Sequence, residues 1–129
     1  MRAVRRRDTA PEKAVADILL AMKIYHIRNP ESLPGKPDFF FQELKLIVFV
    51  HGCFWHGHSS CSKGTTLPKT NRQFWANKIS GNKLRDARVN RWYWRRGFSV
   101  VTVWECELRH KMLPSRLYRK LFNNSQVCK

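Results

Sequence analysis

A short segment of the chain gathers most of the side chains that bind soft metal ions. From His51 to Cys61, eleven residues contain three histidines and two cysteines. A structural Zn²⁺ takes four nitrogen or sulfur ligands in a tetrahedron. Cys53, His58 and Cys61 can supply three of them from one loop. The alternative interpretation is a set of buried free thiols beside solvated histidines.

The fourth ligand has to come from another part of the chain. Cys106 follows the last predicted strand, which returns it to the same edge of the sheet, whereas Cys128 lies in a polar tail. No apolar segment follows the basic N-terminus, so we expect no export signal and a reducing compartment, where metal binding is favoured over disulfides. We therefore predict a closed structural zinc site made of Cys53, His58, Cys61 and Cys106.

The overall charge indicates the partner. The chain has 129 residues, with 25 Lys and Arg against nine Asp and Glu, for a net charge of +16. This charge favours nucleic acid as the partner, because neutralising its phosphates releases counterions. An anionic membrane surface is the second candidate. A merely basic, ribosomal-type protein is the non-catalytic alternative. No stretch is long and apolar enough to span a membrane, and the aromatic content argues against disorder.

Two histidines, His51 and His56, are not needed by a zinc site and are available for other chemistry. Hydrolysis of a phosphodiester needs hard oxygen ligands for Mg²⁺ and a group that takes a proton from water near neutral pH. Asp38 together with His56 or His51 meets both needs. The structural alternatives are a turn or capping aspartate and packed or solvated histidines.

Pro37 and Asp38 also begin a P-D-x₄-E-x-K pattern, which suggests a nuclease triad of Asp38, Glu43 and Lys45. Geometry argues against that triad, because five strand residues at about 3.3 Å each place Glu43 about 16 Å from Asp38. The residues opposite Asp38 lie at the end of the next strand, around Val50 and His51. We therefore predict that Glu43 and Lys45 are solvated turn residues.

The elements that would position these residues follow from hydrophobic periodicity and turn signals. We expect a helix over 10–23 capped by Asp8 or Thr9, a hairpin of strands over 38–41 and 46–50, a long basic helix over 72–96, a strand over 98–104 and a helix over 113–122. The order α-β-β-α-β-α predicts an α/β fold with a mixed central sheet flanked by helices. We expect a single domain over 1–129, with a basic arm at 1–8 and a polar tail at 123–129.

Three segments together resemble the very-short-patch-repair (Vsr) mismatch endonucleases: Leu33–Phe39, His51–His58 and Val103–Arg109. Matches at 9–13 and from Phe74 to Asp86 follow in the same order, so the resemblance covers nearly the whole chain. It implies a restriction-endonuclease-like fold. It also implies a Mg²⁺-dependent enzyme that nicks the strand carrying the mispaired T, on the 5′ side of that T, at a T·G mismatch left by deamination of 5-methylcytosine.

The resemblance further implies roles for individual residues. Asp38 and the main-chain carbonyl of Val50, where the family commonly has Thr, would bind Mg²⁺, and His56 would be the general base. The supporting polar residues of the site would be His51, Glu12 and Asp86, and zinc would bind Cys53, His58, Cys61 and Cys106. The aromatic wedge beside the mismatch would be Phe54, Trp55 and Trp75, and the mismatched bases would be contacted by Lys78 and Asn82.

Two other functions stay open from the sequence. One is a nuclease of the same fold that acts at a different site or lesion, and the other is a zinc-containing DNA-binding module without catalysis. The expected partner is double-stranded DNA with a T·G mismatch, with mismatch-repair proteins as further partners. We expect a monomer, because only one strand is cut, and a cytoplasmic, nucleoid-associated location in a prokaryotic or phage system. The arm before the first helix is shorter than the family often has.

Overall fold

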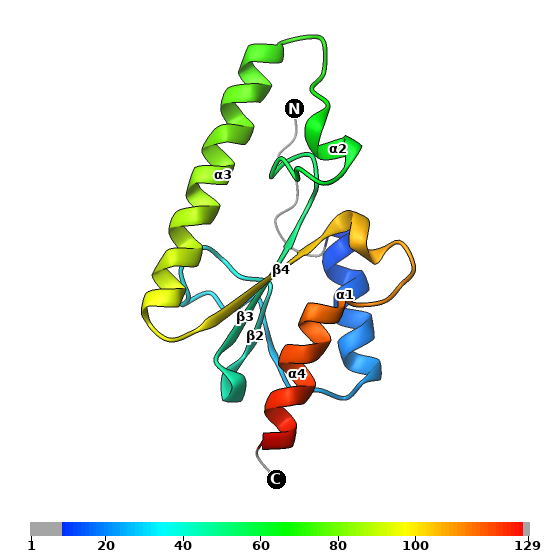
Figure 1. The fold of residues 1–129 in the computed structure, drawn as a ribbon, viewed down its shortest axis with the longest axis vertical. Coiled ribbons are helices and arrows are strands. Elements are labelled where there is room, and N and C mark those ends of the chain that lie inside the picture. Colours follow the sequence, from blue (N-terminus) through cyan, green and yellow to red (C-terminus); the bar gives the residue numbers. More distant parts are fainter. Residues whose placement is uncertain (1–8, 128–129) are drawn as a thin grey trace.

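A computed structural model describes residues 9–127, and side chains up to Phe122 (Figure 1). The predicted arm at 1–8 and the weaker zinc candidate Cys128 lie outside the described residues. A four-stranded sheet has the order β1-β2-β3-β4. Its strands are β1 (Ile27–Arg28), β2 (Phe39–Phe41), β3 (Leu46–His51) and β4 (Ser99–Trp104). The first three strands are antiparallel, and β3 runs parallel to β4, so the predicted mixed sheet is confirmed.

Helices cover both faces of this sheet (Figure 1). They are α1 (Ala10–Ala21), α2 (Ser62–Thr65), α3 (Arg72–Arg95) and α4 (Ser115–Val127), with 3₁₀ turns η1 (Gln42–Leu44) and η2 (Glu105–Leu108). Thr9 caps α1, because its side-chain oxygen accepts a hydrogen bond from the backbone N–H of Glu12. No helix within residues 9–127 is long and apolar enough to cross a membrane.

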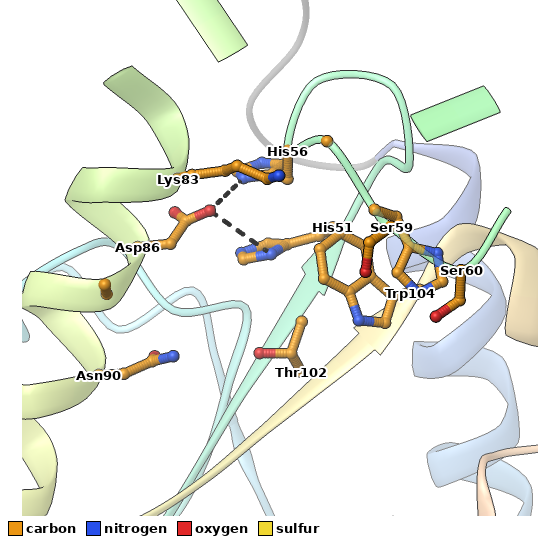
Figure 2. A pocket seen from close by; sticks show the side chains of 12 residues that line it. His51, His56, Ser59, Ser60, Lys83, Asp86, Asn90, Thr102 and Trp104 are labelled. Carbon is orange, nitrogen blue, oxygen red and sulfur yellow. Dashed lines mark hydrogen bonds and ion pairs between the residues drawn. The ribbon is translucent and has the colours of Figure 1, made fainter. Parts of the chain in front are cut away.

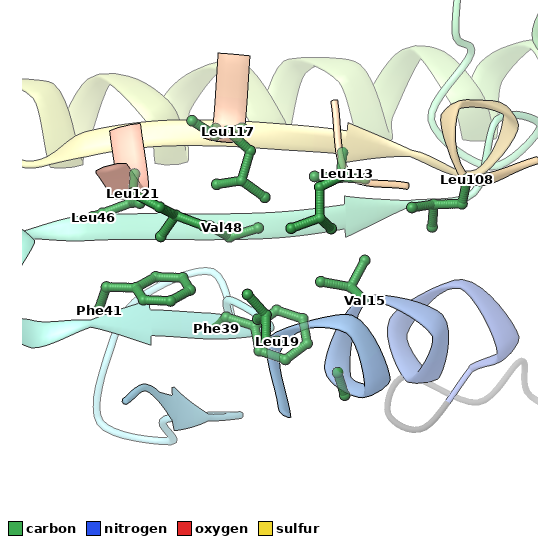
Figure 3. Packing of buried hydrophobic residues seen from close by; sticks show 13 residues of the cluster. Val15, Leu19, Phe39, Phe41, Leu46, Val48, Leu108, Leu113, Leu117 and Leu121 are labelled. Carbon is green, nitrogen blue, oxygen red and sulfur yellow. The ribbon is translucent and has the colours of Figure 1, made fainter. Parts of the chain in front are cut away.

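The continuous apolar sequence of β3 fits a strand that is buried on both faces. Leu46 and Val48 pack against α1 and α4 in the larger hydrophobic cluster (Figure 3). Ile47 and Phe49 point the other way and pack with Tyr93 of α3. Because side chains alternate along a strand, the His51 side chain lies on the face that α3 covers.

The structure differs from the expected elements at several boundaries. β1 was not predicted, because two residues carry no periodicity, yet Ile27 pairs with Phe40 of β2. α1 ends at Ala21 rather than at 23, since Lys23 adopts a left-handed conformation with φ of 57°. The last helix begins at 115 and continues to 127, so residues 123–127 of the expected tail are helical. The loop over 51–69 contains the single turn α2.

Candidate active site and metal cluster

The four predicted zinc ligands lie together at one end of the sheet. One ligand atom from each of Cys53, His58, Cys61 and Cys106 lies within 4.8 Å of all the others. The parallel pairing explains how Cys106 arrives there. His51 of β3 is opposite Trp104 of β4, so the residues two positions further along, Cys53 and Cys106, leave the same sheet edge side by side.

The cluster has the donor chemistry of a tetrahedral metal site. Burial raises the pKa of the Cys53 thiol to about 12, so a cation is needed to keep that sulfur deprotonated near neutral pH. Backbone N–H groups of Gly64 and Lys63 hold the pKa of the Cys61 thiol below its ordinary value. A Cβ atom on Gly64 would lie 2.0 Å from the His58 carbonyl oxygen, so only glycine lets α2 pack this closely. Three thiols and one imidazole therefore fit a soft metal ion.

A second cluster consists of His51, His56 and Asp86 (Figure 2). The two imidazole rings stack with centroids 3.7 Å apart and planes 5° apart. His56 Nδ1 lies 2.6 Å from Asp86 Oδ2, within hydrogen-bond distance, whereas His51 Nδ1 is 3.9 Å from the same oxygen. When Nδ1 of His56 donates to the carboxylate, Nε2 is left with its lone pair available for a proton.

His51 is neutral in this environment. Burial and, to a lesser extent, the neighbouring His56 lower its pKa to about 3, and the charge of Asp86 only partly opposes this. Among the buried side-chain nitrogen and oxygen atoms of the described residues, His51 Nδ1 alone lacks a hydrogen-bond partner. A buried polar atom without a partner is costly, which fits a position where a water molecule or ligand completes the site.

Two buried carboxyl groups form the acidic part of the site. Asp38 is 8% exposed, and its Oδ2 accepts a hydrogen bond from the Val50 N–H at 2.6 Å. Glu12 of α1 is 1% exposed and interacts with the Asp38 carboxyl group. Burial, aided by the charge of Glu12 and opposed by the hydrogen bond from Val50, raises the pKa of Asp38 to about 7. Paired buried carboxyl groups supply the hard oxygen ligands that fit Mg²⁺.

The hairpin places Asp38 where the strand geometry predicts. Its backbone N–H donates to the Val48 carbonyl at 3.0 Å, and its side chain contacts Val50, the residue before His51. Glu43 and Lys45 are exposed at the opposite end of the hairpin, in and after η1. The Asp-Glu-Lys triad is therefore absent from the described structure.

Aromatic side chains cluster where the 51–69 loop meets the start of α3. The rings of Phe54, Trp55 and Trp75 are half-buried and contact one another edge-on, with centroids 5.2 to 5.5 Å apart. Phe74, which the sequence analysis did not assign to the aromatic wedge, is 58% exposed. Its ring centroid lies 5.1 Å from that of Trp75. Its position next to Trp75 in the sequence is the feature that could have indicated its place in this aromatic cluster.

The two residues predicted to contact bases lie on α3. Asn82 is half-buried, and its Nδ2 donates to the Trp55 carbonyl at 2.7 Å. This hydrogen bond holds the 51–69 loop against α3. Lys78, one turn earlier, is exposed.

A pocket of about 450 Å³ opens beside the stacked histidines (Figure 2). Its lining includes Lys83, Asn90, Thr102 and Trp104, none of which is among the predicted site residues. Trp104 stacks on His58 at 4.2 Å and contacts His51 edge-on at 5.3 Å, so it joins the two clusters. The spacing of Lys83 and Asn90, seven residues apart on one helix face, could have indicated their shared orientation.

A mixed sheet with paired carboxyl groups, paired histidines and a basic helix packed on one face has the composition of a nuclease site. Residues 1–63 match the family described as DNA mismatch endonuclease Vsr. The chain is 42% identical over 109 residues to the DNA mismatch endonuclease Vsr of Escherichia coli K12, covering 84% of this chain and 69% of that protein. It is 43% identical over 108 residues to the type II nicking enzyme V.XorIIP of Xanthomonas oryzae, covering 84% and 78%.

A third relative matches over a slightly longer part of the chain. The type II nicking enzyme V.NmeAIP of Neisseria meningitidis serogroup A is 40% identical over 113 residues, which is 88% of this chain and 79% of that protein. The chain therefore belongs to the Vsr family and is a DNA mismatch endonuclease. This confirms the predicted family and enzyme class, and it argues against a DNA-binding module without catalysis.

Proposed function

We propose that the enzyme hydrolyses one strand of double-stranded DNA on the 5′ side of the T in a T·G mismatch, with Mg²⁺ as cofactor. The observations that carry this proposal are the hydrogen-bonded His56–Asp86 pair and the buried Asp38 carboxyl group, which accepts from the N–H of Val50, the residue before His51. An acid-base group and a hard-oxygen cation site are the two elements that phosphodiester hydrolysis requires.

Asp38 and the main-chain carbonyl of Val50 would hold Mg²⁺, with Glu12 supporting Asp38. The ion would supply positive charge at the phosphate and lower the pKa of the attacking water. His56 takes the proton from that water at Nε2. Asp86 keeps the proton on Nδ1 of His56 and stabilises the imidazolium that forms. His51, neutral and stacked on His56, keeps the second ring in place without adding charge.

Zinc is the metal we propose for the cluster of Cys53, His58, Cys61 and Cys106. It would be structural, because four protein ligands leave no open position. Its task is to hold the loop that carries Trp55 and His56 in a defined conformation. The chemistry of three thiols and one imidazole supports this assignment.

Mismatch preference would come from the aromatic cluster of Phe54, Trp55 and Trp75. Inserting aromatic rings between base pairs costs a few kcal/mol of stacking, and the cost is lowest where pairing is already faulty. Lys78 and Asn82 would contact the mispaired bases from α3, and the +16 charge would bind phosphates. We further propose one domain acting as a monomer in the cytoplasm, alongside mismatch-repair proteins.

A labelled duplex with one T·G mismatch tests this function directly. We expect Mg²⁺-dependent nicking on the 5′ side of the mispaired T, blocked by EDTA and absent from the matched T·A duplex. Equal nicking of both duplexes would contradict mismatch specificity and favour a nuclease of another site. Tight binding of the mismatched duplex without a nick at any Mg²⁺ concentration would contradict the proposed active site.

A further inference from the structure

Asn29 contacts both acidic residues of the site from the strand region that the sequence did not predict. Its side-chain Nδ2 donates to Glu12 Oε2 at 3.0 Å. Its backbone N–H donates to the carbonyl oxygen of Asp38 at 2.9 Å. The neighbouring Arg28 donates from Nε to the same Glu12 oxygen at 3.2 Å. Asn29 is thereby a direct structural link between Glu12 on α1 and Asp38 at the start of β2.

The backbone at this position restricts which residues fit. Asn29 has φ of 53°, in the left-handed region that glycine, asparagine and aspartate tolerate best. Among these three, only asparagine brings a side-chain N–H donor. Aspartate would instead place a third carboxyl group against Glu12. The hydrogen bond to Glu12 therefore requires asparagine at this position. The left-handed backbone conformation does not, because glycine or aspartate could also adopt it.

Burial makes this contact matter. Glu12 is 1% exposed, so its carboxylate depends on protein donors in place of water. The Asn29 amide orients that carboxylate without adding a charge, and so does not compete electrostatically with a cation. Residues that orient metal ligands through hydrogen bonds typically change metal affinity by about 10- to 100-fold when they are replaced.

We propose that Asn29 is a positioning residue that orients Glu12 towards Asp38 and thereby sets the affinity of this carboxyl pair for a divalent cation. The inference rests on the proposed function, in which the pair binds Mg²⁺. It assigns to Asn29 a role in cation affinity and none in proton transfer, because the residue contacts only Glu12 and Asp38 among the proposed site residues.

The test compares Asn29→Gly with Asn71→Gly in the full-length, zinc-loaded protein. Glycine tolerates the left-handed backbone, so Asn29→Gly removes the amide and little else. Asn71 is a matched control, since it is exposed, has φ of 57° and makes no side-chain capping bond at the start of α3. Mn²⁺ binding without DNA, followed by electron paramagnetic resonance, measures cation affinity apart from catalysis. Nicking as a function of Mg²⁺ concentration gives the second readout.

We expect Asn29→Gly to bind Mn²⁺ about 10- to 100-fold more weakly than wild type and to need correspondingly more Mg²⁺ for half-maximal nicking. Its maximal rate at saturating Mg²⁺ should stay within about twofold, and Asn71→Gly should match wild type. In a Glu12→Gln background, Asn29→Gly should add little, because the two residues act as one unit. A purely structural role for Asn29 would instead lower thermal stability without this change in cation affinity.

The outcomes separate this inference from the proposed function. Wild-type cation affinity in folded Asn29→Gly would overturn the role of Asn29 while leaving the nuclease intact. If Asn29→Gly does not keep the wild-type circular dichroism spectrum, Asn29→Asp replaces it, since it preserves size but cannot donate to Glu12. Unchanged Mn²⁺ affinity in that variant would equally overturn the inference. Failure of the wild-type protein to nick with any divalent cation would instead contradict the proposed function.

Discussion

His56 and Asp86 come from the loop after β3 and from α3, 30 residues apart in the sequence, and their side chains lie 2.6 Å apart. The carboxylate accepts from Nδ1 and so determines which imidazole nitrogen can act as a base. Asp86 Oδ2 also lies 3.9 Å from His51 Nδ1, so both stacked imidazole rings face the same carboxylate. Asp86 therefore organises the histidine side of the proposed active site.

Replacement of Asp86 by Asn should lower the single-turnover nicking rate by about 10²- to 10⁴-fold, because the His56 ring loses its charged acceptor and its preferred tautomer. DNA affinity, measured by fluorescence anisotropy, should change little. Asp17→Asn, on the exposed face of α1, is the matched control and should nick like wild type. A wild-type rate in Asp86→Asn would remove His56 from its role as base.

Asp38→Asn should abolish Mg²⁺-dependent nicking while zinc content and DNA binding are retained. The amide can still accept the Val50 N–H bond, so the hairpin keeps its geometry, but the carboxylate charge is lost. Glu43→Gln tests the rejected triad in the same assay, and we expect full activity because Glu43 is exposed in η1. Residual nicking by Asp38→Asn, or its loss in Glu43→Gln, would show that the active site is assigned wrongly.

Removal of the proposed structural zinc should unfold the loop over 51–69. Cys53→Ala should lose bound zinc, measured by mass spectrometry, and lower the melting temperature, because metal binding to such a site contributes folding free energy. A strong chelator should have the same effect on wild type. Cys128→Ala should retain one zinc per chain. A stable, zinc-free Cys53→Ala protein would contradict the zinc assignment, and zinc loss in Cys128→Ala would contradict the ligand set.

Two glycine substitutions should have opposite effects on stability. In Gly64→Ala the new Cβ would meet the His58 carbonyl oxygen at 2.0 Å, and backbone cannot move aside cheaply, so we expect a loss of about 2 kcal/mol or more. In Gly81→Ala, on α3, the Cβ meets nothing within 4 Å. That variant should be about 0.5–1 kcal/mol more stable, from helix propensity. Urea unfolding of both variants gives the comparison, and equal stabilities would contradict the close packing of α2.

The buried Asp38 should make stability depend on pH in Mg²⁺-free buffer. Its pKa is raised from 3.8 to about 7 by burial, so between these values the folded state holds a proton that the unfolded state has released. Stability from this group is therefore present at low pH and is lost as pH rises towards 7, and Asp38→Asn lacks this dependence. Urea unfolding at pH 5 and pH 8 should show wild type losing stability relative to Asp38→Asn. Parallel behaviour of the two proteins would contradict the buried environment of Asp38.

The sequence by itself determines the features that depend on local spacing. The apolar run of β3 predicts a strand buried on both faces, and the rise per residue separates Asp38 from Glu43. The proposed zinc ligands could be chosen because three of them lie in one loop and Cys106 follows the last predicted strand. These features need only periodicity, composition and the order of the elements.

Only the tertiary structure decides the contacts that join distant segments. Nothing near Asn29 in the sequence indicates that its amide reaches Glu12, and nothing near Asn82 indicates that it donates to the Trp55 carbonyl. Such pairs depend on how α1 and α3 pack on the two faces of the sheet, which is set by the summed burial of many side chains. Local propensity acts over a few residues, whereas the orientation of a catalytic group is set by neighbours that folding brings from far along the chain.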